Sequence, residues 1–274
     1  MNIDLSKYRK PKYLCKTISN DELDILNGSD SDFISLYKQK YIQALAKYNL
    51  WFKLADISDI EELIPLINDC YEESGMPTNV TFFELYKCIT YGHGMLICNE
   101  KGHIMGSIFH VQYSTRGNSA LGTRFTLHPN IRGKGLGLVL LSYSALIAME
   151  SGSKLQRGLI GHSNFASVNN QLNHMGWFFD TFHQYKNWEP SFDEFMILSP
   201  KGFILNRLDK CKVADFIQSH NNGTDYQLVA YNDLDRIQKM YIEDDFRIIA
   251  YVKPKVGRND HSFLAIPFEK IIEK

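Results

Sequence analysis

Hydrophobic and polar residues along the middle of the chain predict three consecutive strands. The strands are expected over residues 95–98, 103–112 and 120–127, with turn-forming residues at 100–102 and 116–118 between them. Because the connections are short, neighbouring strands must run in opposite directions. The pattern therefore predicts an antiparallel meander.

Two helices with an apolar face are expected before this meander, after a short strand at 51–55. Each opens with a capping box, in which Ser or Thr is followed three residues later by Glu. Pro65 lies inside the first helix and is expected to kink or shorten it. The boxes are Ser58 with Glu61 and Thr81 with Glu84, and the apolar face of the first helix comprises Ile60, Leu63, Ile64, Ile67 and Tyr71.

A long helix is expected after the meander, from about Gly135 to Met149, and Gly152 is expected to end it. It is apolar nearly all round, which indicates burial against a sheet. A strand at 155–161, a helix at 165–175 and strands at 177–188 and 194–198 are expected to follow. From 51 to 198 the predicted order is βααβββαβαββ.

The chain divides by pattern into three regions. Residues 1–47 form an N-terminal extension with a helix from 33, residues 48–199 form the main domain, and residues 200–274 form an appendage. The appendage is predicted to be α+β, packed on the core or serving as an arm that joins two subunits of a homodimer. Its expected elements are strands near 203–205, at 226–230 and at 246–252, and a helix at 234–242.

Composition narrows the class of protein. A net charge of -1 over 274 residues gives no general attraction to nucleic acid or to an anionic membrane. No run approaches about 18 apolar residues, and the polar start lacks a signal core, so a cytoplasmic protein is expected. The five cysteines form no CxxC pair, which predicts reduced thiols rather than a disulfide frame or a zinc site.

The segment 127–141, LHPNIRGKGLGLVLL, places an Arg- and Gly-rich turn between a strand and the apolar helix. The first N–H groups of a helix lack intrahelical partners and lie at the positive end of its dipole, which suits a pyrophosphate. Glycines let phosphate oxygens approach the main chain and permit positive φ. The alternative interpretation is that Gly135 and Gly137 only let the helix pack closely on a sheet. The residues concerned are Gly133, Gly135 and Gly137, with Arg132 and Lys134 adding charge.

Two other glycine-rich phosphate motifs do not fit this turn. A P-loop needs Ser or Thr after its Lys, but Gly135 follows Lys134. A dinucleotide fold needs an acidic residue at a strand end about 20 positions later, and none is present.

The same string resembles motif A of the GNAT superfamily of acyl-CoA-dependent N-acetyltransferases, in which a strand ends in V-x-P-x-x-R-G-x-G-[IL]-G. Leu127 stands for the Val. The resemblance implies an α/β (α+β) fold with a mixed, mostly antiparallel sheet flanked by helices, and acetyl-CoA as co-substrate without a metal. It also implies that the amides from Arg132 through Gly137 bind the coenzyme A pyrophosphate. The matching positions are Pro129, Arg132, Gly133, Gly135, Leu136 and Gly137.

Acetyl transfer needs a polarised thioester carbonyl, a neutral amine and a proton donor for the leaving thiolate. The resemblance assigns the N–H of Leu127 to the thioester oxygen. The family's Glu base is missing, because residues 120–129 contain no carboxylate. His128 and His162, at two strand ends, are the substitutes, with His110 less favoured. The alternative is that each only bonds a backbone group.

A second family motif, N-x-x-[AS]-x-x-L-Y-x-x-x-G-F, is matched in part. The resemblance implies that Asn164 and Ser167 bind the pantetheine arm or the adenosine side, but the spacing to Gly176 is one residue too long. The Tyr that acts as general acid in the family would align with Leu172 here, so Tyr143 and Tyr185 are considered as hydroxyl donors instead. The aromatic stretch from Trp177 to Trp188 is interpreted as packing between strands. The alternative is an acceptor pocket in which Asp180 or Glu189 attracts a cationic amine.

Three acidic residues at the end of the first helix are interpreted as solvent-exposed: Asp69, Glu72 and Glu73.

The sequence thus predicts an acetyl-CoA-dependent N-acetyltransferase that acts on a primary amine of a small molecule by direct attack. The first alternative is a protein Lys or N-terminal acetyltransferase, and the second is a module that binds acyl-CoA without turnover. A nucleic-acid patch formed by Arg132, Lys134 and Arg157 is disfavoured by the near-neutral charge.

Overall fold

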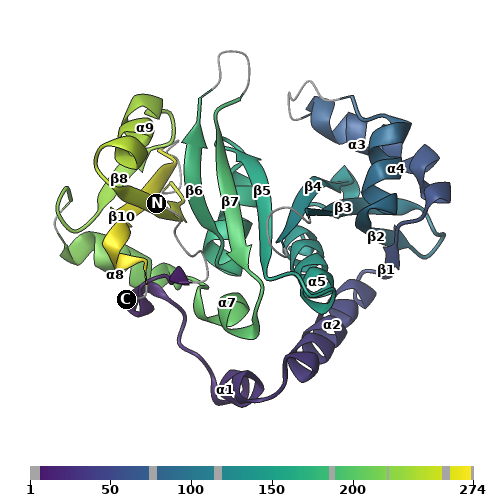
Figure 1. Ribbon diagram of the computed structural model, residues 1–274, viewed down its shortest axis with the longest axis horizontal. Coiled ribbons are helices and arrows are strands. Elements are labelled where there is room, and N and C mark those ends of the chain that lie inside the picture. Colours follow the sequence, from purple (N-terminus) through teal and green to yellow (C-terminus); the bar gives the residue numbers. More distant parts are fainter. Residues whose placement is uncertain are drawn as a thin grey trace. The chain divides into compact units, whose positions relative to one another are not determined.

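The computed structural model describes residues 7–73, 79–113, 119–184, 189–220, 222–254 and 260–272 (Figure 1). The chain forms two compact units, and the boundary between them falls inside one strand. The central unit is Ser29–Arg157, and the terminal unit is Met1–Gly28 with Gly158–Lys274. Each unit is described by itself.

The central unit contains the predicted meander. Its strand order is β1-β2-β3-β4-β5, where β5 only begins in this unit. All neighbours are antiparallel except β4 and β5, which are parallel. The elements are α2 (Asp30–Ala46), β1 (Leu50–Leu54), α3 (Ile60–Glu73), α4 (Phe82–Thr90), β2 (Gly92–Asn99), β3 (Ile104–Tyr113), β4 (Ser119–Leu127), α5 (Leu136–Glu150) and β5 (Leu155–Gly161).

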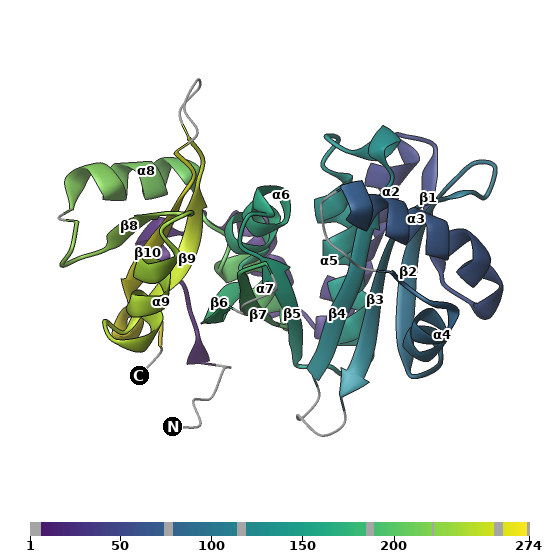
Figure 2. The same cartoon turned by 90° about the horizontal axis from the view of Figure 1, so that it is seen from above.

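Helices cover both faces of these strands (Figure 2). Phe109 of β3 belongs to a core formed with α3 and α4. Gly106, which faces the opposite way, lies so close to α5 that an added Cβ would be 3.7 Å from the Leu140 side chain. The buried residues of the α3 and α4 face include Ile60, Leu63, Ile67, Leu85, Leu96 and Phe109.

A bulge interrupts β4 before its end. Ser107 of β3 pairs with Thr126, whereas Phe109 pairs with Thr123, so β4 holds one extra residue. Arg124, inside the bulge, has φ of 53°, in the left-handed region. Bulges of this kind redirect the strand residues that follow them.

The terminal unit contains the strand order β5-β7-β6 and a separate sheet of order β8-β10-β9. Residues of both belong to one core, in which Phe192 of β7 meets Phe263 of β10 edge-on at 5.6 Å. The elements are α1 (Asn20–Asn27), α6 (Phe165–Val168), β6 (Phe178–His183), β7 (Ser191–Ile197), α7 (Pro200–Leu205), α8 (Lys210–Ser219), β8 (Gln227–Ala230), α9 (Leu234–Ile242), β9 (Phe246–Val252) and β10 (Ser262–Pro267).

A π-helical segment, Asn169–Met175, follows α6. Two of its carbonyl groups accept hydrogen bonds from outside the segment: Lys10 Nζ donates to Leu172 O, and the N–H of Leu208 donates to Asn173 O at 2.9 Å. The Asn173 side chain also exchanges hydrogen bonds of 2.8 and 3.0 Å with the backbone of Tyr251. This segment therefore binds residues from both ends of the chain.

The element order predicted for residues 51–198 is confirmed, and so is the fold class of mostly antiparallel strands flanked by helices. Two details are wrong. It is Asp56, not Ser58, that forms the capping box, because a 3₁₀ turn precedes α3, and α3 itself continues through Pro65 to Glu73. The strand expected at 203–205 is the helix α7, since Ser199 caps it and Pro200 occupies its first position.

Other elements were not predicted at all, and some predictions are not tested by the structure. The elements α1, α8 and β10 were not expected from the sequence. The turn at 116–118 lies outside the described residues, as do Tyr185 and Trp188. The region limits at 47 and 199 stay predictions.

Candidate functional site

The turn between β4 and α5 requires glycine at two positions. Gly133 has φ of 75° and Gly135 has φ of 77°, a region that disfavours side chains. A Cβ added to either residue would meet no atom within 4 Å, so close packing is not the reason for these glycines. Gly137, by contrast, is buried in the first turn of α5.

The helix α5 begins without a side-chain cap and without an acidic residue in its first turn. Leu138 and Val139 both donate to Gly135 O, at 3.1 and 3.3 Å, so the N–H groups of Leu136 and Gly137 precede the first intrahelical bonds. With 15 residues, α5 places a substantial partial positive charge at this end. Unpaired N–H groups and the positive end of a helix dipole are features that suit a negatively charged group.

The two basic side chains of the turn differ in their partners. Arg132 donates to Leu127 O at 2.8 Å and pairs with Glu73 at 2.6 Å. Its charge is therefore largely offset, and the side chain ties the turn to the end of β4. Lys134 is exposed and donates to Asn130 O at 3.0 Å, so its charge stays at the turn.

The N–H of Leu127 points away from β3. The next residue, His128, donates its N–H to Met105 O on β3 at 2.8 Å, and successive N–H groups of a strand alternate in direction. The parallel pairing of β4 with β5 covers Ser119–Leu121, whereas the pairing with β3 continues to Leu127. This orientation supports the predicted role of the Leu127 N–H toward a thioester oxygen.

His128 acts as a cap in this structure. Its Nδ1 accepts the N–H of Asn130 at 3.2 Å, at the start of the 3₁₀ turn Pro129–Ile131. In the neutral ring the proton then sits on Nε2, which makes His128 a donor toward other groups.

His162, at the end of β5 in the terminal unit, has the opposite polarity. Its Nδ1 lies 3.1 Å from the carbonyl oxygen of Pro190 and must carry the proton to bond it, which leaves the lone pair on Nε2. The ring is buried, and burial lowers the pKa of His162 below its ordinary value, although Pro190 and Glu189 act in the raising direction. The imidazole is therefore neutral at pH 7 and able to accept a proton.

Asn164 and Ser167 follow His162 in the terminal unit. The Asn164 side chain accepts the N–H of Ser167 at 3.3 Å and so caps α6. The side-chain oxygen of Asn164, a residue predicted to bind coenzyme A, is therefore engaged within the protein.

Several other side chains considered in the sequence are core residues. His110 is buried beside Gln156, with 2.8 Å between the two Nε2 atoms, and burial lowers the pKa of His110 to about 3. Tyr143 is buried and stacks on Phe52 at 3.8 Å. The aromatic residues Trp177, Phe178, Phe179 and Phe182 are buried, which confirms that they are packing residues.

A buried carboxyl group was missed in the sequence. Glu194 of β7 is 4% exposed, and its Oε1 accepts a hydrogen bond from Gln171 of the π-helical segment at 2.7 Å. Burial raises the pKa of Glu194 well above its ordinary value, which favours the protonated form of the group. The pattern of β7 held a clue, because Glu194 shares the inward face with Phe192.

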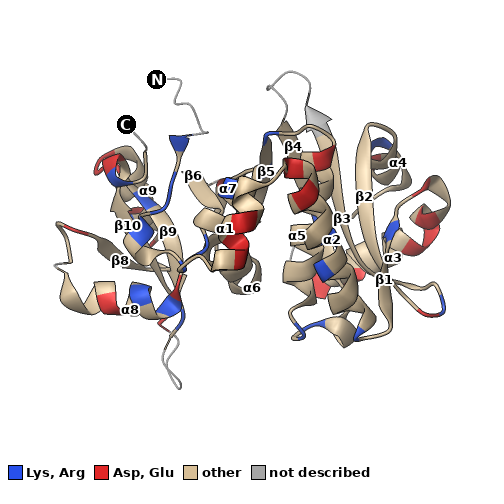
Figure 3. Ribbon diagram, turned by 90° about the horizontal axis from the view of Figure 1, so that it is seen from below, with Lys and Arg blue, Asp and Glu red and all other residues tan. Residues whose placement is uncertain are grey.

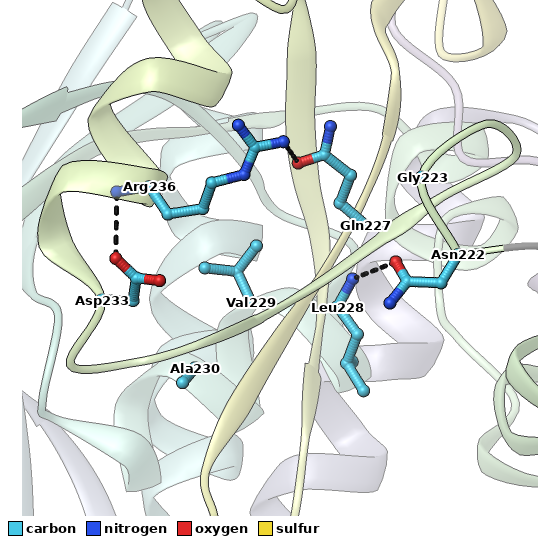
Figure 4. A pocket seen from close by; sticks show the side chains of 8 residues that line it. All are labelled: Asn222, Gly223, Gln227, Leu228, Val229, Ala230, Asp233 and Arg236. Atoms are coloured by element: carbon cyan, nitrogen blue, oxygen red, sulfur yellow. Dashed lines mark hydrogen bonds between the residues drawn. The ribbon is translucent and has the colours of Figure 1, made fainter.

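A hollow of about 430 Å³ lies on the terminal unit beside β8 (Figure 4). Its charged side chains are engaged: Arg236 bonds Gln227 and pairs with Asp244 at 2.8 Å, and Asp233 caps α9. The hollow holds none of the predicted site residues. Its lining residues are Asn222, Gly223, Gln227, Leu228, Val229, Ala230, Asp233 and Arg236.

The described residues show neither a metal site nor a membrane-spanning helix. No group of three or more His, Cys, Asp or Glu in these ranges has an arrangement that would hold a metal ion. No helix in the described part of the chain is both long and apolar enough to cross a membrane.

The charged residues of α8 are mixed in sign: acidic and basic residues are interspersed along the helix rather than gathered by sign (Figure 3).

Comparisons with known proteins gave matches among solved structures only. No family model matches the chain, and no curated protein does. A GNAT-family acetyltransferase from Staphylococcus aureus Mu50 matches with a TM-score of 0.46 at 15% identity, over 54% of this chain and 99% of that one.

Two further solved structures are similar over the same share of the chain. The ribosomal-protein-S18-alanine N-acetyltransferase from Escherichia coli has a TM-score of 0.47 at 10% identity, over 55% of this chain and 94% of that one. The yncA protein of Salmonella typhimurium, with its cofactor acetyl-CoA, has a TM-score of 0.46 at 17% identity, over 55% and 94%.

Proposed function

We propose that this protein is an N-acetyltransferase that moves an acetyl group from acetyl-CoA to the primary amine of a small molecule. The observation that carries the proposal is the uncapped N-terminus of α5, which follows a turn with two left-handed glycines at the end of β4. Gly135, the N-cap of α5, offers no side-chain cap, and the N–H groups of Leu136 and Gly137 precede the first intrahelical bonds.

The pyrophosphate of coenzyme A is the anion that this backbone is proposed to bind. Main-chain N–H groups and the dipole of α5 stabilise its negative charge, and the exposed ammonium of Lys134 adds to this. Arg132 holds the end of β4 through Leu127 O, but its own main-chain N–H donates to Pro129 O at 3.1 Å, so the amide of Arg132 is left out of the proposed site.

The reaction is direct attack of the amine nitrogen on the thioester carbonyl carbon. A C–N bond forms, the C–S bond breaks, and the amine loses a proton while the thiolate gains one. The Leu127 N–H is proposed to donate to the carbonyl oxygen, where negative charge develops in the transition state.

The two histidines are proposed to take different parts in the reaction because their hydrogen bonds differ in polarity. His162 has its lone pair on Nε2 and is proposed as the base that accepts the amine proton. His128 has its proton on Nε2 and is proposed to stabilise the leaving thiolate by a hydrogen bond, while water supplies the proton that the thiolate gains. His110 is left out, since its low pKa and its bond to Gln156 fit a core residue.

The test is release of coenzyme A thiol from acetyl-CoA with a panel of amines, paired with calorimetric binding of coenzyme A. Binding with thiol release and an N-acetylated product by mass spectrometry is the expected result. Acetylation of proteins without any small amine would shift the acceptor class to Lys or N-terminal amines. Binding without release for every acceptor would replace the enzyme by a binding module, and absence of binding would refute the proposal.

A further inference from the structure

Residues of the C-terminal sheet surround the segment that follows β5. The Tyr231 ring stacks on His162 with 6.0 Å between ring centroids and an interplanar angle of 28°. Tyr231 also meets Phe165 edge-on at 4.9 Å. His261 stacks on Phe165 at 3.8 Å, with rings only 6° from parallel. These contacts lie within the terminal unit and join residues about 70 to 100 positions apart in the chain.

The edge of the His162 ring contacts other residues than its face does. Pro190 O bonds Nδ1, and the backbone N–H of His162 donates to the same carbonyl at 2.9 Å. A carboxylate oxygen of Glu189 lies 3.9 Å from Nδ1, and Ser163 Oγ donates to that oxygen. The ring is thus fixed in plane by Pro190 and Glu189 and fixed at its face by Tyr231.

Attachment of the C-terminal sheet does not depend on Tyr231. The two hydrogen bonds between Asn173 and Tyr251 attach β9 to the π-helical segment, and Phe263 packs into the shared core. Tyr231 is only partly buried and lies against this core rather than in it. The contact of Tyr231 with His162 is therefore not needed to attach the C-terminal sheet, and it calls for another explanation.

We propose that Tyr231 and Glu189 are positioning residues for His162, so that Tyr231, from the C-terminal appendage, contributes to catalysis through His162. This rests on the proposed function. Tyr231 holds the plane of the imidazole, while Pro190 and Glu189 keep the proton on Nδ1 and leave Nε2 to take the proton of the amine. When Nε2 accepts that proton, the Glu189 carboxylate stabilises the imidazolium that forms.

The titratable groups near His162 come from two parts of the terminal unit. Glu189 precedes β7, and Tyr231 follows β8. His261 and Tyr251 form the next layer, joined by a hydrogen bond between the Tyr251 hydroxyl and His261 Nδ1. Glu189 is the anion nearest to the ring among these groups, and it raises the pKa of His162 against the effect of burial.

The experiment compares Tyr231→Leu, Tyr231→Phe and Glu189→Gln, with Leu228→Ala on β8 as the control. Tyr231→Leu should lower kcat about tenfold, whereas Tyr231→Phe, which keeps the ring, should stay within about twofold of wild type. Glu189→Gln should lower kcat and move the acidic limb of its pH profile to lower pH. The affinity for coenzyme A should stay within about twofold in all four variants.

An independent readout uses the protein without substrate. The ring signals of His162, followed by NMR through a pH titration, should report a lower pKa in Glu189→Gln than in wild type and an unchanged one in Leu228→Ala. Unchanged kcat and an unchanged pH profile in Tyr231→Leu and Glu189→Gln would overturn the inference. Loss of coenzyme A binding by wild type would instead overturn the proposed function, while the NMR result would still test the contact.

Discussion

Two junctions in this chain share one order of elements and differ in how the helix begins. The β4–α5 junction (residues 127–137) and the β5–α6 junction (residues 161–167) each run from a strand through a histidine and a turn into a helix. At the first, Gly135 is the N-cap and offers no side chain. At the second, Asn164 is the N-cap and accepts the N–H of Ser167.

The difference shows that the capping residue decides whether a helix start is available to an outside anion. An Asn or Ser cap satisfies the backbone donors internally, whereas a left-handed glycine leaves them for a ligand. The histidines follow the same contrast, because Nδ1 of His128 accepts a bond and Nδ1 of His162 donates one.

The first prediction breaks the β4–α5 junction. Gly135→Glu should weaken coenzyme A binding at least about 100-fold, which is about 3 kcal/mol, because a carboxylate would stand where the phosphates bind. Calorimetry measures the affinity. Gly152→Glu is the matched control, since Gly152 also has positive φ and an added Cβ meets no atom within 4 Å, but it lies beyond the other end of α5. Equal affinity in both variants would contradict the assignment.

The second prediction concerns the histidine of the β5–α6 junction. His162→Ala should lower kcat about 100-fold through loss of the base, with coenzyme A affinity unchanged. His128→Ala should lower kcat less, about tenfold, because water can protonate a thiolate. Steady-state rates at saturating acetyl-CoA measure both. His183→Ala is the control, as His183 pairs with Asp193 on neighbouring strands; a loss of equal size there would point to a general effect of removing an imidazole.

The third prediction sharpens the contrast with a buried histidine. His110 has a pKa lowered to about 3 in the folded protein, so it charges on unfolding as the pH falls below its ordinary value near 6.5. The stability it contributes is complete above about pH 6.5 and is lost as the pH falls toward 3, by about 2 kcal/mol at pH 5. Denaturant unfolding of wild type and His110→Gln at pH 5 and pH 7 tests this. The same pH dependence in both would remove His110 as the cause.

The fourth prediction exchanges the caps. Asn164→Ala should lower the free energy of unfolding by about 1 kcal/mol and leave coenzyme A affinity unchanged. Gly135→Asn, whose side chain tolerates positive φ better than most, should place an amide group at the start of α5 and weaken coenzyme A binding about fivefold. Thermal unfolding and calorimetry measure the two effects. Tighter binding in Gly135→Asn would show that the helix start is not the anion site.

The sequence predicted those features that depend on neighbours in the chain. The capping box of Thr81 and Glu84 and the left-handed Gly133 and Gly135 are local, and the structure confirms them. The helix α7 was missed although Ser199 and Pro200 marked its start, because Phe203 to Leu205 are apolar enough for a strand.

Features that depend on distant partners were not visible in the sequence. The pairing of Arg132 with Glu73 joins residues 59 positions apart, and the contact of Tyr231 with His162 joins residues on separate elements. The place of Glu194 on the inward face of β7 is a local feature, but its hydrogen-bond partner Gln171 comes from another element. Charge offsets and proton positions in the candidate site arise from such contacts.

The π-helical segment has a consequence for how the protein is made. Its Leu172 carbonyl is bonded by Lys10, its Asn173 carbonyl by Leu208, and its Asn173 side chain by Tyr251. Lys10 is synthesised before this segment, and Leu208 and Tyr251 are synthesised after it. Lys10 must therefore stay without this partner until Leu172, 162 positions later, has been made, and the bonds to Tyr251 form only once β9 has left the exit tunnel.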